Sequence, residues 1–79
     1  MESLVRAAEL LAAGDWEAAH RIVQDDPSEL AAWMHGIVHL LEGDVSNARY
    51  WYSQARRPFP TRPDVQREIE AASVAARRT

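Results

Sequence analysis

Residues 39–48, which read His-Leu-Leu-Glu-Gly-Asp-Val-Ser-Asn-Ala, carry the pattern that decides the fold. Gly43 is suited to end a helix in a left-handed turn, and Asp44 is suited to cap the helix that follows. Residues 10–19, Leu-Leu-Ala-Ala-Gly-Asp-Trp-Glu-Ala-Ala, repeat this order 29 positions earlier. Each copy has a small alanine five residues after its glycine, which lets two helices approach closely. The two copies therefore predict two helix–turn–helix hairpins.

Further cap and turn signals divide the rest of the chain. Asp26 is expected to cap a helix in which Pro27 takes the first turn and Glu29 completes a capping box. Pro58-Phe59-Pro60 cannot continue a helix and predicts a stiff connector. Between these signals, apolar residues recur with the 3.6-residue period of a buried helical face, and no segment is typical of a strand. Five helices are predicted, over residues 3–13, 15–25, 27–42, 44–57 and 63–77.

The predicted fold class is all-α, and 79 residues suffice for one domain with a thin core. The chain has no cysteine, which excludes disulfides and cysteine-based zinc sites. No apolar run approaches the ~20 residues of a membrane span, and no secretory signal is visible, so the expected location is the cytoplasm. We expect a single domain 1–79, divided into a first hairpin 1–26, a second hairpin 27–57, a proline-rich connector 58–62 and a C-terminal helix 63–79.

The net charge of −3 hides a difference between the two ends of the chain. Residues 1–45 hold nine acids and two arginines, for a net charge of −7, whereas residues 46–79 hold three acids and seven arginines, for +4. Two explanations stay open. The ends are two differently solvated surfaces, or an acidic face meets a basic face in a dimer or with a partner.

The second copy of the repeat resembles a tetratricopeptide repeat, because Gly36, Gly43-Asp44, Ala48, Tyr52, Ala55 and Pro60 fall at the signature spacing of that family. The first copy keeps Gly14-Asp15, Ala19 and an apolar Val23. The resemblance covers residues 1–60, although the 29-residue offset is shorter than the family's usual ~34. The chain also resembles a set of small bacterial proteins of unknown function, which implies no activity.

The resemblance implies that the helix over 27–42 lines a concave, peptide-binding surface with Leu30, Trp33, Ile37 and Leu40. It also turns His35, Gly36 and His39 toward the next helix. A helical wheel instead groups the large apolar residues on one arc and leaves His35, His39 and Glu42 facing water. We expect near-complete burial of this helix, with its apolar face covered by the last helix, by a second copy or by a partner segment.

The three histidines raise a second hypothesis. His35, His39 and Glu42 share one helical face, and Glu17 and His20 form a Glu-x-x-His pair on the preceding helix. Together they could hold a metal ion or act in catalysis. Such spacings are common by chance, so hydrogen-bonded histidines in the hairpin, or a partly exposed polar face, are the expected alternatives. The sequence predicts no resident metal, no cofactor and no catalytic residue.

Nothing in the sequence supports an enzyme or a nucleic-acid-binding protein. No nucleophile elbow, phosphate loop or Ser/His/Asp arrangement is present. In the run Tyr50-Trp51-Tyr52, Trp51 and Tyr52 are expected to face the core and Tyr50 to face away from it. The expected function is a small interaction or self-assembly module without catalytic activity. Its partner would be a second copy or a peptide segment, with no nucleic acid or membrane bound, and its predicted contact residues are Leu30, Trp33, Ile37, Leu40 and Tyr50.

Overall fold

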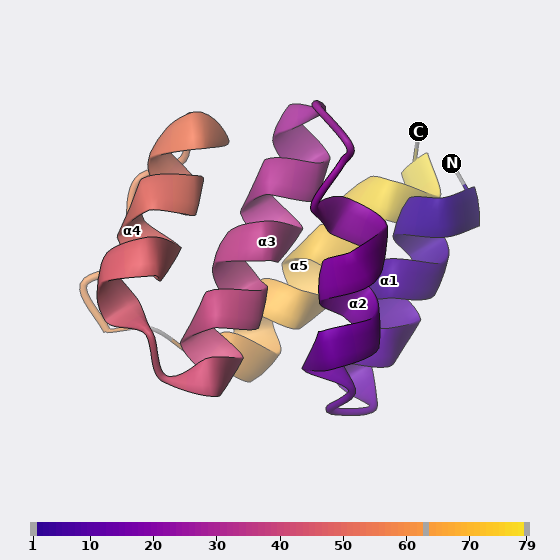
Figure 1. The fold of residues 1–79 in the computed structure, drawn as a ribbon, viewed down its shortest axis with the longest axis horizontal. Coiled ribbons are helices and arrows are strands. Elements are labelled where there is room, and N and C mark those ends of the chain that lie inside the picture. Colours follow the sequence, from indigo (N-terminus) through magenta and orange to yellow (C-terminus); the bar gives the residue numbers. More distant parts are fainter. Residues whose placement is uncertain (1, 63, 79) are drawn as a thin grey trace.

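A computed structural model describes residues 2–62 and 64–78, and this part of the chain contains five helices and no strand. The all-α class, with two hairpins and a C-terminal helix, is confirmed (Figure 1). Among these residues, no helix is both long and apolar enough to span a membrane. The helices are α1 (Glu2–Ala12), α2 (Trp16–Val23), α3 (Glu29–Glu42), α4 (Val45–Gln54) and α5 (Val65–Arg78).

Both Gly-Asp turns form as the sequence predicts. Gly14 and Gly43 adopt left-handed backbone angles, with φ of 83° and 85°. The side chain of Asp15 then accepts a hydrogen bond from the backbone N–H of Ala18, at 3.2 Å. Asp44 caps α4 in the same way and accepts from the N–H of Asn47, also at 3.2 Å. The repeat in the sequence is therefore a repeat of local structure.

The start of α3 differs from the prediction. Ser28, not Asp26, is the N-cap, because its hydroxyl accepts from the N–H of Ala31 at 3.1 Å. Asp26 instead accepts from the N–H of Ser28 at 2.9 Å, which closes a short turn before the helix. Glu29 consequently becomes the first residue of α3 and forms an ion pair with Arg56 at 3.3 Å, so the predicted capping box is wrong.

The end of the second hairpin is also shorter than predicted. α4 ends at Gln54 rather than near residue 57, because Arg56 turns left-handed with φ of 58°. The connector then packs Phe59 edge-on against Tyr52, with the Arg49 guanidinium 4.5 Å above the Phe59 ring. α5 begins at Val65, and Asp64 accepts from the N–H of Arg67. The predicted start of this helix, Pro63, lies outside the described residues.

α3 is the central helix, and the near-complete burial expected for it is confirmed. Every residue from 31 to 38 is buried, and α1, α2, α4 and α5 all pack against α3. Gly36 allows the close approach of α4, because a Cβ atom at this position would lie 2.5 Å from Cδ1 of Tyr52. His35, which the helical wheel left facing water, is buried, because α3 has a neighbour on each side.

α5 folds back across α1 and α3, behind them in the view of Figure 1. One carboxylate oxygen of Glu68 on α5 accepts from Nε1 of Trp33 at 3.1 Å and from the hydroxyl of Tyr52 at 2.5 Å. Burial, followed by this carboxylate, raises the pKa of the Tyr52 hydroxyl and keeps it a donor. The last helix, α5, therefore covers the apolar face of α3, which is one of the three coverings that the sequence left open.

Candidate metal centre

Three histidines meet where the first hairpin joins the second. His20 lies in the last turn of α2, one residue after the buried Ala19, and α2 packs against α3. His35 and His39 lie one turn apart on the face of α3 that meets this helix. Each histidine offers one ring nitrogen, and the three nitrogens lie within 4.8 Å of one another. The packing of two helices thus assembles a set that no single helix contains.

The closest pair is formed by Nε2 of His20 and Nε2 of His35, which lie 3.1 Å apart. The rings of His35 and His39 stack with their centroids 5.1 Å apart, and the ring of His20 meets both of them edge-on. Without a bound ion, one of the two facing Nε2 atoms must donate a proton to the other. Two imidazoles that point their ring nitrogens at each other are well placed to share a cation.

His35 is the buried member of the set, with 5% of its surface exposed. Burial, followed by the neighbouring His20 and His39, lowers the pKa of His35 from 6.5 to about 4. Its ring is therefore neutral at physiological pH, which is the form that binds metals. Its Nδ1 is buried and has no hydrogen-bond partner among the described residues.

A carboxylate orients the third histidine. Nδ1 of His39 lies 2.5 Å from Oε1 of Glu42, one turn further along α3. With this nitrogen held by the carboxylate, Nε2 is the nitrogen that remains for an ion. A carboxylate behind a ligating imidazole fixes its tautomer and strengthens it as a ligand. Glu42 is thus an orienting residue, which differs from the ligand role that the sequence hypothesis allowed.

Two features of the site were missed in the sequence. The ring of Trp51 stacks on His35 with centroids 3.8 Å apart, and so closes the buried side of the cluster. Asp44, expected only as a helix cap, also places a carboxylate oxygen within 4.8 Å of His39 and Glu42. Hydrogen bonds from Asn47 lower the pKa of Asp44, so this carboxylate stays ionised. The helical spacing of Trp51 predicted its core-facing side, but not which ring it would meet.

Glu17 does not join the histidines. It is exposed in the first turn of α2, and it belongs to neither group of potential ligands found in the described residues. Of the Glu-x-x-His pair, only His20 therefore belongs to the cluster. Of the five residues in the sequence hypothesis, the structure gathers three histidines and one orienting carboxylate.

The residues predicted to contact a partner separate into two groups. Trp33 and Ile37 are buried, with exposed fractions of 4% and 0%, because α5 covers them. Leu30 and Leu40 are half-buried, and Tyr50 is 53% exposed. Trp33 and Ile37 thus serve the core of the chain itself and cannot reach a partner. Leu30, Leu40 and Tyr50 are the members that retain an open surface.

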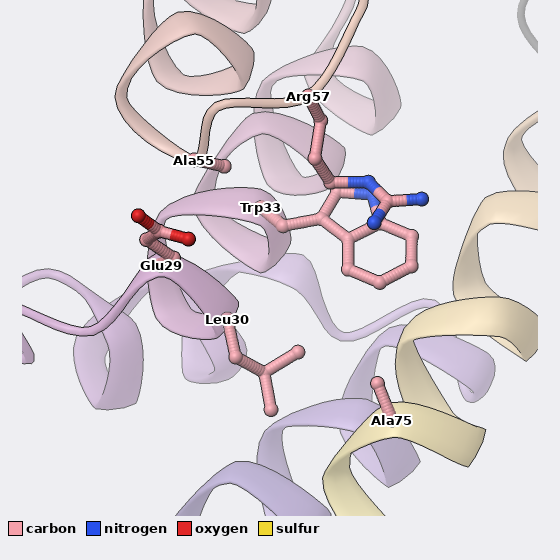
Figure 2. A pocket seen from close by; sticks show the side chains of 6 residues that line it. All are labelled: Glu29, Leu30, Trp33, Ala55, Arg57 and Ala75. Carbon is pink, nitrogen blue, oxygen red and sulfur yellow. The ribbon is translucent and has the colours of Figure 1, made fainter.

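A groove of about 220 Å³ remains at the rim of this covered face, lined by Glu29, Leu30, Trp33, Ala55, Arg57 and Ala75. Figure 2 shows Arg57 lying across the indole of Trp33 on one side of the groove, with Leu30 and Ala75 on the other. The guanidinium carbon of Arg57 lies 3.5 Å from the centre of the Trp33 ring. This contact is a cation–π interaction on one face of the indole.

No family model, no curated protein and no solved structure matches this chain. Three imidazoles, one orienting carboxylate and a second carboxylate nearby form an arrangement suited to binding a divalent transition-metal ion.

Proposed function

We propose that this chain is a metal-binding helical-hairpin domain, which holds a zinc-class divalent ion at His20, His35 and His39. The observation that carries the proposal is the convergence of three ring nitrogens, from two helices, within 4.8 Å of one another. This convergence is tertiary, so it is much less expected by chance than a His-x-x-x-His spacing. The proposal departs from the sequence expectation of no resident metal.

The spacing of the closest two nitrogens is compatible with a bound zinc ion. Two nitrogens bound to Zn²⁺ at about 2.0–2.1 Å lie about 3.3–3.4 Å apart at a tetrahedral angle. Nε2 of His20 and Nε2 of His35 are 3.1 Å apart, which is within a few tenths of an ångström of this value. His20 is only half-buried, so its ring can turn to adjust the geometry around an ion, while Glu42 holds the ring of His39.

The surroundings favour a cation at this point. The carboxylates of Glu42 and Asp44 lie close to His39 and attract positive charge. Three imidazole ligands suit Zn²⁺, Cu²⁺ and Ni²⁺, whereas Mg²⁺ and Ca²⁺ prefer oxygen ligands. Binding would also tie α2 to α3, and so join the two hairpins at the junction where the shortened repeat brings them together.

The test is zinc binding by protein whose purification tag has been removed, so that no added histidine competes. We expect one Zn²⁺ per chain by isothermal titration, with negligible affinity for Mg²⁺. Zinc at 100 times its dissociation constant stabilises a protein by about 2.7 kcal/mol. For a domain of this size, such a gain raises Tm by roughly 10–20 °C, and a chelator should reverse the rise.

Matched variants separate binding from folding. His39→Ala removes a half-buried ligand without opening the core, and should abolish both the titration signal and the rise in Tm. Glu17→Gln is the control, because Glu17 is exposed on α2 and outside the cluster, and it should bind zinc as the unaltered protein does. If the unaltered protein binds no zinc, or if His39→Ala binds it equally well, the histidines are a packed polar cluster and the proposal is wrong.

A second candidate function is self-association, supported by the charge difference between the two parts of the chain. The acidic first part supplies α1, α2 and α3, and the basic second part supplies α4 and α5. We propose that the partner is a second copy, which would meet the exposed Tyr50 and the groove beside Leu30. Opposite charges then steer the basic surface of one copy toward the acidic surface of another.

Light scattering over a concentration series tests this second proposal. A mass near 18 kDa, twice the 8.9 kDa of one chain, is expected at micromolar concentration and low salt. Tyr50→Glu should shift the mass to that of a monomer without changing the circular dichroism spectrum. A single mass near 8.9 kDa at every concentration would contradict self-association and leave the metal centre unaffected.

A further inference from the structure

We infer that the ion at the three histidines keeps a fourth coordination position open to solvent. This position would hold a water molecule that ionises near neutral pH and exchanges with a small monoanion such as a carboxylate. The inference rests on the proposed metal binding and adds to it an exchangeable site for an anionic ligand. Three observations support it: the ligand count, the charge of the ligands and the access of solvent.

The described residues supply three ligands and no fourth. The group around the ion contains His20, His35 and His39, while the nearby carboxylates of Glu42 and Asp44 form a separate group that shares only His39. Glu42 is already engaged with Nδ1 of His39 at 2.5 Å. Zinc sites with a purely structural role usually have four protein ligands, whereas three protein ligands leave a place for water or substrate.

The ligand set is also uncharged. Neutral imidazoles leave the double positive charge of the ion undiminished, in contrast to the thiolates or carboxylates of many structural sites. An ion of this kind strongly attracts an anion to its free position. The carboxylate of Glu42 lies behind His39, so it strengthens this ligand without neutralising the free position directly.

Solvent reaches the cluster from the side of His39. The side chains of His39 and Glu42 are 12% and 30% exposed, and His20 is half-buried. The opposite side is closed, because Trp51 stacks on His35 and α3 is buried around it. A ligand of a few atoms can therefore approach the ion from one direction, while the protein shields the other.

The chemistry of the open position follows from these features. A water molecule bound to a zinc ion there would lose one proton to bulk solvent and become hydroxide, and zinc-bound water in known sites of three histidines has a pKa of about 7. A monoanion would bind by replacing the water, with no bond broken within the anion. Above the pKa of the bound water, hydroxide competes with the anion, so anion affinity should fall about tenfold for each further pH unit.

Cobalt(II) provides the test, because it takes the place of zinc in tetrahedral sites and has a visible spectrum that reports on its ligands. We expect the tag-free protein loaded with one equivalent of Co²⁺ to show a pH-dependent spectral change near neutral pH. Sodium azide, used as the probe anion, should alter the spectrum and saturate at one azide per cobalt. The control Glu17→Gln should behave in the same way.

The outcomes distinguish this inference from the proposed function. Cobalt binding with no response to azide or pH would show that the fourth position is filled, which overturns the inference but leaves metal binding intact. Failure to bind either Co²⁺ or Zn²⁺ would overturn both. Glu42→Gln should retain the azide response and bind metal 10- to 100-fold more weakly, as expected for an orienting residue. An azide response that appears only in Glu42→Gln would identify Glu42 as the fourth ligand and refute the open position.

Discussion

Replacement of Gly36 by alanine is expected to destabilise the protein sharply, although alanine is the better helix former. Gly36 lies in the middle of α3, and a Cβ atom there would lie 2.5 Å from Cδ1 and 2.8 Å from Cε1 of Tyr52. Both distances are far inside van der Waals contact. The new methyl group and the tyrosine ring cannot occupy these positions together, so one of the two helices or the ring has to move.

The ring of Tyr52 has little freedom to move. It is 1% exposed, its hydroxyl donates to Glu68, and its face meets the edge-on ring of Phe59. Overpacking of a core typically costs about 1–3 kcal/mol, and a lost hydrogen bond to a carboxylate about 1.5–3 kcal/mol. The gain in helix propensity from alanine offsets only about 1 kcal/mol. We therefore expect the free energy of unfolding to fall by about 2–4 kcal/mol.

Urea denaturation followed by circular dichroism would measure this loss, and thermal denaturation should show a fall in Tm of roughly 10–25 °C. The same substitution in a Tyr52→Leu background removes the clash and should be neutral or slightly stabilising. Gly14→Ala is the control, because no atom lies within 4 Å of its Cβ position and its φ of 83° alone makes alanine unfavourable. Its cost of about 1–2 kcal/mol should be equal in both backgrounds.

Two results would refute this reasoning. The first is a Gly36→Ala protein as stable as the unaltered one, which would mean that α4 can move away from α3 at no cost. The second is a coupling energy between Gly36→Ala and Tyr52→Leu below about 0.5 kcal/mol, the level found for residues that do not touch. Either result would remove the close approach of α3 and α4 as a determinant of the fold.

Three further predictions concern the packing around α3. Glu68→Ala removes the acceptor shared by Trp33 and Tyr52, and should cost about 2–4 kcal/mol in urea denaturation; a loss below 1 kcal/mol would show that α5 is held by apolar contacts alone. In the metal-free protein with chelator, the unfolded chain binds a proton at His35 that the folded chain excludes. Stability should therefore be complete above pH 6.5 and fall by about 2–3 kcal/mol as the pH drops toward 4, and a flat profile would contradict the lowered pKa. Ser28→Ala should cost about 1 kcal/mol through loss of the cap of α3, which a thermal melt would detect as a fall in Tm of about 4–8 °C.

The three-histidine cluster shows how much helical spacing alone can predict. The separation of four residues between His35 and His39 placed both on one face of a helix, and the glutamate three residues later was correctly expected beside them. The contribution of His20 depended on how α2 packs against α3, which no local pattern contains. The same packing leaves Glu17 outside the cluster, although its spacing from His20 had suggested a metal-ligand pair.

The sequence by itself determined the local structure, because its signals act between near neighbours. Gly14-Asp15 and Gly43-Asp44 specify their turns through backbone conformation and a side chain that reaches only three residues onward. The predicted cap of α3 was wrong, because the side chain of Ser28, not that of Asp26, caps this helix. Asp26 instead accepts from the N–H of Ser28 in the turn that precedes the helix.

Only the tertiary structure decided which surfaces are buried and which side chains meet. The return of α5 across α1 and α3 placed Trp33 and Ile37 in the core, although the same residues would line an open face in a longer array of hairpins. It also brought one ring nitrogen from each of three histidines, on two helices, within 4.8 Å of one another. The physical reason is the same in both cases. Contacts between helices depend on the angle and separation at which their buried faces fit together, and these are properties of the packed core rather than of any one segment.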